Sequence, residues 1–201
     1  IGDSKDFTFT PVYYTEENSV FLGEYRQKNK YSELYVDTSY SQGYKKLNKK
    51  SDDGSSIART PGSRNHFFFN FLGSYDDLLF ASNDLEMNIQ KISQKNYLKV
   101  HQINTLNIKQ DISALQNDII LRSYEDSKQL TLEAYVYENL NEKTHNKKYQ
   151  YTLPSIAFNN FFRRFNQSIN LSNEFSAKNL GENINQTHQI NKIATNSDLK
   201  K

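Results

Sequence analysis

The side chains that most often do chemistry are few and scattered in this sequence. None of its histidines is followed three or four residues later by a second metal-ligating side chain. The four histidines are His66, His101, His145 and His188. The acidic pairs Asp52-Asp53 and Asp76-Asp77 lack the ligand spacing of a calcium loop and are typical of turns. We therefore expect no metal site and no cofactor.

Other catalytic patterns are also missing from the sequence. It contains no glycine-rich phosphate loop, no nucleophile elbow, and no serine, histidine and aspartate within one stretch. Arg163-Arg164 follows Phe161-Phe162 and could hold an anion, but a basic pair beside an apolar strand more commonly anchors a membrane interface. We expect no catalytic residues, so the protein is predicted not to be an enzyme.

Composition narrows the class of protein further. The 201 residues include no cysteine and no tryptophan, but 14 tyrosines and 13 phenylalanines, so aromatic side chains supply much of the apolar surface. Basic and acidic residues are interspersed and give a net charge of +2, which does not call for a nucleic-acid partner. No run approaches the roughly 20 apolar residues of a membrane helix. The polar start and end predict that the sequence belongs to a longer chain.

Alternation of apolar and polar residues is the recurring pattern and predicts β-strands. It predicts an all-β fold, an antiparallel meander of about six to eight strands, each with one apolar face. The expected strands are 7–11, 20–26, 32–40, 66–72, 78–89, 129–137, 149–158 and 167–175. The polar segment 42–65 is predicted to be a long extracellular loop. Residues 108–119 fit either a strand or an amphipathic helix, and 176–201 are weakly patterned.

Two strands separate their faces most clearly. In 129–137, Leu130, Leu132, Ala134 and Val136 alternate with polar or amphipathic residues. The stripe Phe67, Phe69, Phe71 would be the core of a soluble sandwich or the lipid face of an outer-membrane barrel. Short turns paired with long polar loops favour the barrel. On alternation alone, five residues are expected to face its lumen: Glu24, Arg26, Glu133, Tyr135 and Tyr137.

Several short motifs follow one another over about residues 3–160. They are DFTFTPVYY at 6–14, LGEYR at 22–26, SRNHFFF at 63–69, NYLK at 96–99, YVYENL at 135–140 and YTLPSI at 151–156. Each motif alone is weak, but in this order they resemble the barrel of the LptD family of lipopolysaccharide-assembly proteins. The resemblance implies that 1–175 form part of such a barrel and that 176–201 continue it as barrel or loop.

The resemblance also implies a function and partners. The parent protein would lie in the outer membrane of a Gram-negative bacterium and pass lipopolysaccharide to the outer leaflet without covalent chemistry. An LptE-like lipoprotein would plug it, and a periplasmic Lpt bridge would feed it. The best-studied members carry disulfides, whereas this span has no cysteine.

Two alternatives stay open from the residues themselves. One is a soluble or secreted β-sandwich that binds glycans through exposed tyrosine and asparagine side chains. The other is a different outer-membrane barrel, such as a porin or receptor.

Overall fold

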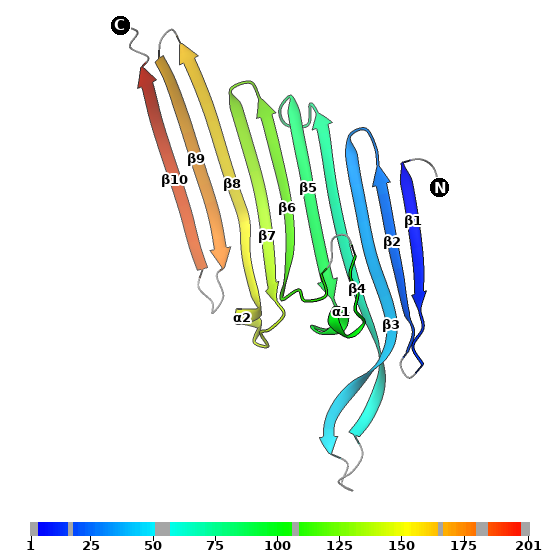
Figure 1. Cartoon of the computed structure of the whole chain (residues 1–201). Coiled ribbons are helices and arrows are strands. Elements are labelled where there is room, and N and C mark those ends of the chain that lie inside the picture. The colour runs from blue at the N-terminus through cyan, green and yellow to red at the C-terminus, as the bar shows by residue number, and fades with distance from the viewer. Residues whose placement is uncertain are drawn as a thin grey trace. The chain divides into compact units, whose positions relative to one another are not determined.

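The computed structural model describes residues 4–15, 18–50, 57–105, 109–164, 167–179 and 185–197. Its strands form one sheet in which each strand pairs with its neighbours in the chain (Figure 1). The strands are β1 Lys5–Val12, β2 Val20–Lys28, β3 Ser32–Lys50, β4 Ile57–Asp76, β5 Ser82–Ile92, β6 Ala114–Glu125, β7 Lys128–Asn139, β8 Tyr149–Arg164, β9 Gln167–Asn179 and β10 Asn185–Ser197. The described helices are α1 (Tyr97–Val100) and α2 (His145–Lys148).

The predicted all-β antiparallel meander is confirmed, but the predicted number of strands was too low. The described residues form a sheet of ten strands in the order β1 to β10. β10 was missed because its sequence is rich in asparagine, glutamine and lysine and has no clear apolar face. It nevertheless pairs with β9 along its whole length. A β-ladder is made by backbone groups, so a polar strand can extend a sheet that already exists.

The prediction of a long loop over 42–65 was wrong. β3 continues to Lys50 and β4 begins at Ile57, while 51–56 lie outside the described residues. The loop was predicted from its charge and polarity, but pairing between the two strands satisfies their backbone groups whatever the side chains are. A Cβ at Gly43 would lie 2.7 Å from Arg64 Nε, so glycine makes room there for the arginine of the facing strand.

The second half of the ambiguous segment 108–119 is a strand, and residue 108 lies outside the described residues. No helix is formed in 109–113, and β6 starts at Ala114. Leu115, Ile119 and Leu121 pair with Glu138, Ala134 and Leu132 on β7. Leu115 and Ile119, two of the residues at helical spacing, therefore lie in a strand with apolar residues at alternate positions, and Ile112 precedes this strand.

The chain divides into two compact units. Unit 1 consists of 1–27, 35–69 and 90–112, and unit 2 consists of 28–34, 70–89 and 113–201. Unit 1 thus holds β1, β2 except its last residue, and most of the β3–β4 hairpin. Unit 2 holds most of β5 and all of β6 to β10, which follow one another side by side in Figure 1.

One face of the unit 2 sheet is apolar. Directly paired residues of antiparallel strands lie on the same face, so the register assigns each residue to a face. Leu132 pairs with Leu121 on β6 and with Ile156 on β8, and Leu121 pairs in turn with Leu85 on β5. The apolar side chains of this face are Leu85, Met87, Ile119, Leu121, Leu130, Leu132, Ala134, Val136, Ile156, Phe158 and Phe175, and the register also places Asn83, Asn117, Ser123 and Asn173 on it. We call it the apolar face of unit 2.

The opposite face of unit 2 is polar. Glu133 pairs with Ile120 and Ser155, and Tyr135 pairs with Asp118. Apart from Ile120, Ala157 and Phe161, this polar face of unit 2 carries mainly hydrophilic or amphipathic side chains. They include Asp84, Glu86, Asp118, Arg122, Gln129, Thr131, Glu133, Tyr135, Tyr137, Ser155 and Asn159.

Neither face of unit 2 is covered along β7. Every residue of β7 is at least partly exposed. On the apolar face Ile119 is 44% exposed and Ile156 37%, and on the polar face Tyr137 is 41% exposed. Within the described residues, no second sheet covers β7 on either side, as one would in a two-layer sandwich.

β8 contains one irregularity in its pairing. Glu133 pairs with Ser155 and Tyr135 with Thr152, so Leu153 and Pro154 together stand opposite the single residue Ala134. β8 has the same shift in its pairing with β9. This is a β-bulge, in which one strand holds one residue more than its partner. The extra residue shifts the alternation of β8 by one position. Residues on both sides of the bulge therefore lie on the same face of the sheet as their partners on β7.

The connections of unit 2 differ between the two ends of its strands. The turns 29–31, 77–81 and 126–127 are short, whereas 140–148 includes α2. In an antiparallel meander successive connections fall at alternate ends, so the short turns of unit 2 share one end. The connection that follows β5, 93–113, is the longest among the described strands.

The turn 77–81 is held by one buried side chain, Asn83. Its Nδ2 donates to the carbonyls of Tyr75 (3.1 Å) and Phe80 (2.7 Å), and its Oδ1 accepts from the backbone N–H of Leu79 (3.2 Å) and from Ser123. We expect Asn83→Ala to cost about 1–3 kcal/mol, because several buried polar groups lose their partner. Denaturant unfolding measures this loss. Asn83→Asp is the matched control: it keeps the acceptor but sets a second oxygen against the carbonyls of Tyr75 and Phe80, so it should lose at least as much.

Candidate functional site

Unit 1 also has an apolar and a polar face. Phe7 pairs with Tyr25 and Phe9 with Gly23, and the Phe9 ring stacks with that of Phe21 at 6.2 Å between centroids. The alternate residues of β2 include Glu24 and Arg26, two of the residues predicted to face a lumen. The structure places both of them on the polar face of unit 1.

Glu24 and Arg26 begin a continuous set of polar contacts across this face. Arg26 Nη2 lies 2.7 Å from Glu24 Oε2, and the guanidinium carbon lies 5.7 Å from the centre of the Tyr35 ring. Tyr35 donates its hydroxyl hydrogen to Asp37 Oδ2 at 3.2 Å. The partly exposed pair on β2 is thereby joined to a buried carboxylate on β3.

Asp37 lies at the centre of a buried hydrogen-bonded chain. His66 Nε2, on β4, lies 2.8 Å from Asp37 Oδ1, and both side chains are at most 1% exposed. The other imidazole nitrogen, Nδ1, contacts Ser39 Oγ, which lies 2.8 Å from the hydroxyl of Tyr97. We call these four residues, Asp37, His66, Ser39 and Tyr97, the buried polar chain. Each of its buried polar groups has a partner, as burial requires.

The buried polar chain was not predicted from the sequence. Asp37 and Ser39 are two residues apart on β3 and must share a face, which alternation could have shown. His66 reaches them from β4, so its position depends on the register of the β3–β4 hairpin, which the sequence does not give. The structure thus brings together a serine, a histidine and an aspartate that no single stretch of sequence contains.

The order aspartate, histidine, serine is that of a hydrolase triad, but access decides what it can do. Ser39 is only 2% exposed, and Tyr97 occupies the side of its hydroxyl away from His66. A nucleophile must come within about 3 Å of a substrate atom, and the burial of Ser39 leaves little room for one beside its oxygen. The hydrogen bonds of the buried polar chain instead hold β3, β4 and the segment after β5 together within unit 1.

The part fastened to the sheet is the segment after β5. Residues 93–105, which we call the strap, include α1 and bury Tyr97, Leu98 and Ile103 to 1–2% exposure. At its start the backbone N–H of Ser93 donates to the carbonyl of Asn65 at 2.9 Å, and its hydroxyl accepts from the N–H of Asn65 at 2.8 Å. Further along, the hydroxyl of Tyr14 donates to the carbonyl of His101 at 3.3 Å.

Burial of Tyr97 has an electrostatic consequence. Desolvation raises the pKa of its phenol, which outweighs the opposite effect of the hydrogen bond to Ser39. An unfolded tyrosine loses its proton near pH 10, whereas Tyr97 in the folded protein keeps it to higher pH. Folding stability should therefore fall as pH rises above about 10. Tyr97→Phe should show a smaller fall than the unaltered protein, as measured by denaturant unfolding across this range.

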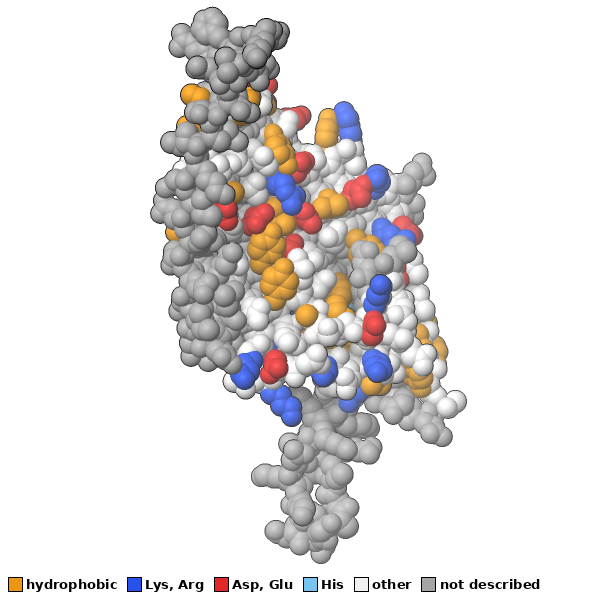
Figure 2. All heavy atoms as spheres, turned by 60° about the vertical axis from the view of Figure 1, so that its left-hand side comes forward, with side chains coloured by type: hydrophobic (Ala, Val, Ile, Leu, Met, Phe, Trp, Pro, Cys, Tyr) orange, Lys and Arg blue, Asp and Glu red, His pale blue; other side chains and the backbone are white. Residues whose placement is uncertain are grey.

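The remaining residues predicted to face a lumen lie together in unit 2. Glu133, Tyr135 and Tyr137 share its polar face, where the rings of Tyr135 and Tyr137 stack at 6.3 Å. Arg122 and Glu86 form an ion pair on the same face at 3.3 Å. Figure 2 shows acidic and basic side chains close to one another among aromatic rings. Arg122 balances Glu86, but Asp84, Asp118 and Glu133 lie on the same face, so acidic side chains predominate there.

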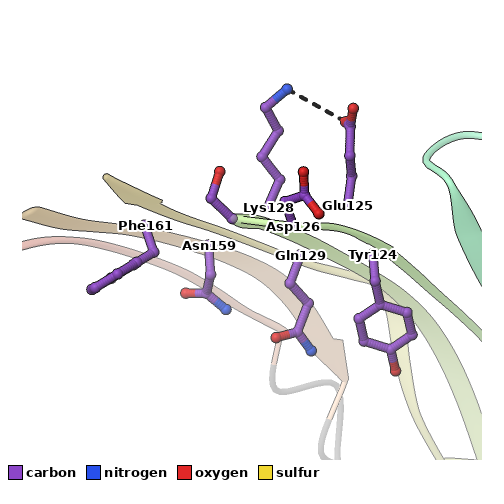
Figure 3. A pocket seen from close by; sticks show the side chains of 8 residues that line it. Tyr124, Glu125, Asp126, Lys128, Gln129, Asn159 and Phe161 are labelled. Carbon is purple, nitrogen blue, oxygen red and sulfur yellow. Dashed lines mark hydrogen bonds and ion pairs between the residues drawn. The ribbon is translucent and has the colours of Figure 1, made fainter. Parts of the chain in front are cut away.

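The polar face continues to the short-turn end of unit 2, where it borders an open hollow. Tyr124 pairs with Gln129 and Gln129 with Asn159, and Figure 3 shows these three side chains pointing to the same side of the sheet. Lys128 and Glu125 form an ion pair at 3.4 Å and point to the other side. The hollow is lined mainly by neutral polar and aromatic groups.

At the far end of β7 an ion pair ties the connection 140–148 to the sheet. Lys148 Nζ lies 2.6 Å from Glu138 Oε1. The hydrogen bond to this carboxylate raises the pKa of Lys148 more than burial lowers it. The ammonium therefore stays charged across the neutral range.

The other candidate groups from the sequence do not assemble into a site. In the part of the chain that the structure describes, no three histidine, aspartate or glutamate side chains are grouped as metal ligands. Asp76 ends β4 and Asp77 follows it with φ 57°, as expected for a turn. The side chains of Arg163, Arg164, His145 and His188, and the pair Asp52-Asp53, lie outside the described part.

Two general findings complete the description of the chain. None of the described helices has the length and apolarity needed to cross a membrane. No protein-family model and no curated protein matches the sequence.

Proposed function

We propose that this chain forms part of the wall of an outer-membrane β-barrel of the LptD type, through which lipopolysaccharide reaches the outer leaflet. The observation that carries the proposal is the sheet of unit 2, apolar on one face and polar on the other, with both faces of β7 open. Lipid on one side and water on the other is the environment that suits such a sheet. Leu132 would face lipid, and Glu133 and Tyr135 would face the lumen.

The connections of unit 2 support the same proposal. Outer-membrane barrels have short turns at the periplasmic end and longer connections outside the cell. The turns 77–81 and 126–127 would then be periplasmic, and 140–148 extracellular. The β3–β4 hairpin, whose tip lies between Lys50 and Ile57, would also be extracellular.

The roles of the proposed lumen residues follow from their contacts. Glu24 and Arg26 pair with each other, and Tyr135 stacks on Tyr137, so these groups offer hydrogen bonds without concentrated charge. A wall of this kind could let the sugars and phosphates of lipopolysaccharide pass while its acyl chains stay in lipid. An LptE-like lipoprotein plug, a periplasmic Lpt bridge and outer-membrane lipids are the proposed partners.

The test uses the full-length protein in the bacterium that produces it. We expect the protein in the outer-membrane fraction, soluble only with detergent, and its depletion should reduce lipopolysaccharide at the cell surface. Recovery in the soluble fraction without detergent would contradict the barrel. Outer-membrane insertion with unchanged surface lipopolysaccharide would assign the chain to another barrel, such as a porin or receptor.

A further inference from the structure

The direction of the hydrogen bonds in the buried polar chain can be assigned from its chemistry. An ionised carboxylate only accepts, so His66 Nε2 carries a hydrogen and donates it to Asp37 at 2.8 Å. When the imidazole is neutral, its Nδ1 accepts from the hydroxyl of Ser39. The Ser39 oxygen then accepts from Tyr97, 2.8 Å away. Each hydrogen is used once, in the order Tyr97 to Ser39 to His66 to Asp37.

A second proton on His66 would break this order. Both imidazole nitrogens then donate, so Ser39 must accept from Nδ1 and turn its own hydrogen towards the Tyr97 oxygen. The Tyr97 hydroxyl has to find another acceptor. Histidine is the side chain whose charge most readily changes at mildly acidic pH. Asp37 can balance the new positive charge, so the proton does not create an unpaired buried ion.

We propose that the strap is a proton-controlled cover over the polar face of unit 1. Neutral His66 holds it closed through Ser39 and Tyr97, and protonated His66 releases Tyr97 and exposes this part of the face. The inference does not depend on the protein being a barrel, because all the groups involved lie within unit 1.

Other ionisable groups surround the buried polar chain and set its electrostatic environment. β2 contributes Arg26 and Glu24, β3 contributes Tyr35 and Asp37, and β4 contributes Arg64. The strap contributes Tyr97 and His101, whose rings lie 5.0 Å apart, and Tyr14 lies 5.8 Å from the His101 ring. Among these groups His66 alone is placed between Asp37 and Ser39, so its protonation acts directly on the bonds that end at Tyr97.

The absence of cysteine allows a direct measurement of strap opening. Leu98→Cys puts a single thiol at a position that is 1% exposed, and Val100→Cys puts one at a strap position that is 59% exposed. The ratio of their labelling rates with 4,4′-dithiodipyridine, which reacts with thiols in acid, reports how often the strap lifts. The exposed thiol corrects for the effect of pH on the reagent.

We expect the labelling of the buried thiol, relative to the exposed one, to rise about tenfold between about pH 7.5 and about pH 5, since the buried Tyr97 hydroxyl is left with no acceptor for its hydrogen. Tyr97→Phe should give the high ratio at both pH values. His66→Gln, which cannot gain a charge, should give a ratio that does not change with pH. A constant ratio in the unaltered background, or a pH dependence that persists with His66→Gln, would overturn the proposal.

A second measurement covers the case in which Leu98→Cys itself loosens the strap. The backbone N–H groups of Val100, His101 and Ile103 donate to carbonyls within the strap at 2.9–3.2 Å. In the unaltered protein their hydrogen exchange, corrected for intrinsic rates, should speed up with acid by a similar factor. Equal protection at both pH values would also contradict a proton-controlled cover.

Discussion

Arginine in place of Leu132 should reduce the folding free energy by about 2–4 kcal/mol if the apolar face of unit 2 meets lipid. Leu132 pairs with Leu121 and Ile156 on that face. A guanidinium placed there would have to be buried in hydrocarbon. Denaturant unfolding of the full-length protein in lipid vesicles measures the loss.

The control variant introduces the same charge at a similar depth in the membrane, but on the polar face of unit 2. Ser155 pairs with Glu133 on the polar face, next to the Leu132–Ile156 pair. Ser155→Arg places the same cation in a hydrated setting opposite a carboxylate, so its cost should be within about 0.5 kcal/mol. Equal losses for the two arginine variants would show that the two faces do not differ in environment.

A larger apolar ring separates a lipid face from a protein core. Leu132→Trp should be tolerated if the residue faces lipid, because the ring has room there. In a close-packed core it should cost about 1–3 kcal/mol. Normal outer-membrane assembly of Leu132→Trp is the expected result, and failure to assemble while Ser155→Arg assembles normally would favour a core.

Loss of His66 should be even more damaging. His66→Leu removes the partner of Asp37, and both side chains are almost completely buried. A buried carboxylate left without its partner typically costs about 3–5 kcal/mol. The loss is measured by denaturant unfolding at neutral pH, where the carboxylate would otherwise be charged.

The matched control removes both members of the pair. Asp37→Val combined with His66→Leu leaves no buried charge, so much of the lost stability should return. Near-additive losses in the two single variants and the double variant would mean that Asp37 and His66 do not interact as the 2.8 Å contact indicates.

Alternation in the sequence predicted the strands well where one face is apolar. β7 is the clearest case. Its apolar residues occupy every second position and all lie on one face, namely Leu130, Leu132, Ala134 and Val136. It missed most of β6, because the polar pair Asn117-Asp118 interrupts the run between Leu115 and Ile119. It also missed β10 and the ends of β3 and β4, where backbone pairing forms strands from polar residues.

The polar faces were predicted only in part. Glu24 with Arg26, and Glu133 with Tyr135 and Tyr137, could be grouped because residues two apart in one strand share a face. The buried polar chain could not, because it joins residues of β3, β4 and the strap. Their meeting depends on the register of a long hairpin and on the path of a connection, and neither leaves a periodic signal.

At the bulge of Leu153 and Pro154, β8 contains one residue more than β7 does. A deletion elsewhere in a strand shifts the frame, so every side chain on one flank turns to the wrong face. At the bulge two residues stand opposite Ala134, and losing either one leaves a regular ladder in which Thr152 and Ser155 keep their partners. The pairing with β9 carries the same shift, so it would become regular as well. Deleting one residue at this point of β8 should thus leave the side chains before and after the bulge on the faces that they occupy now.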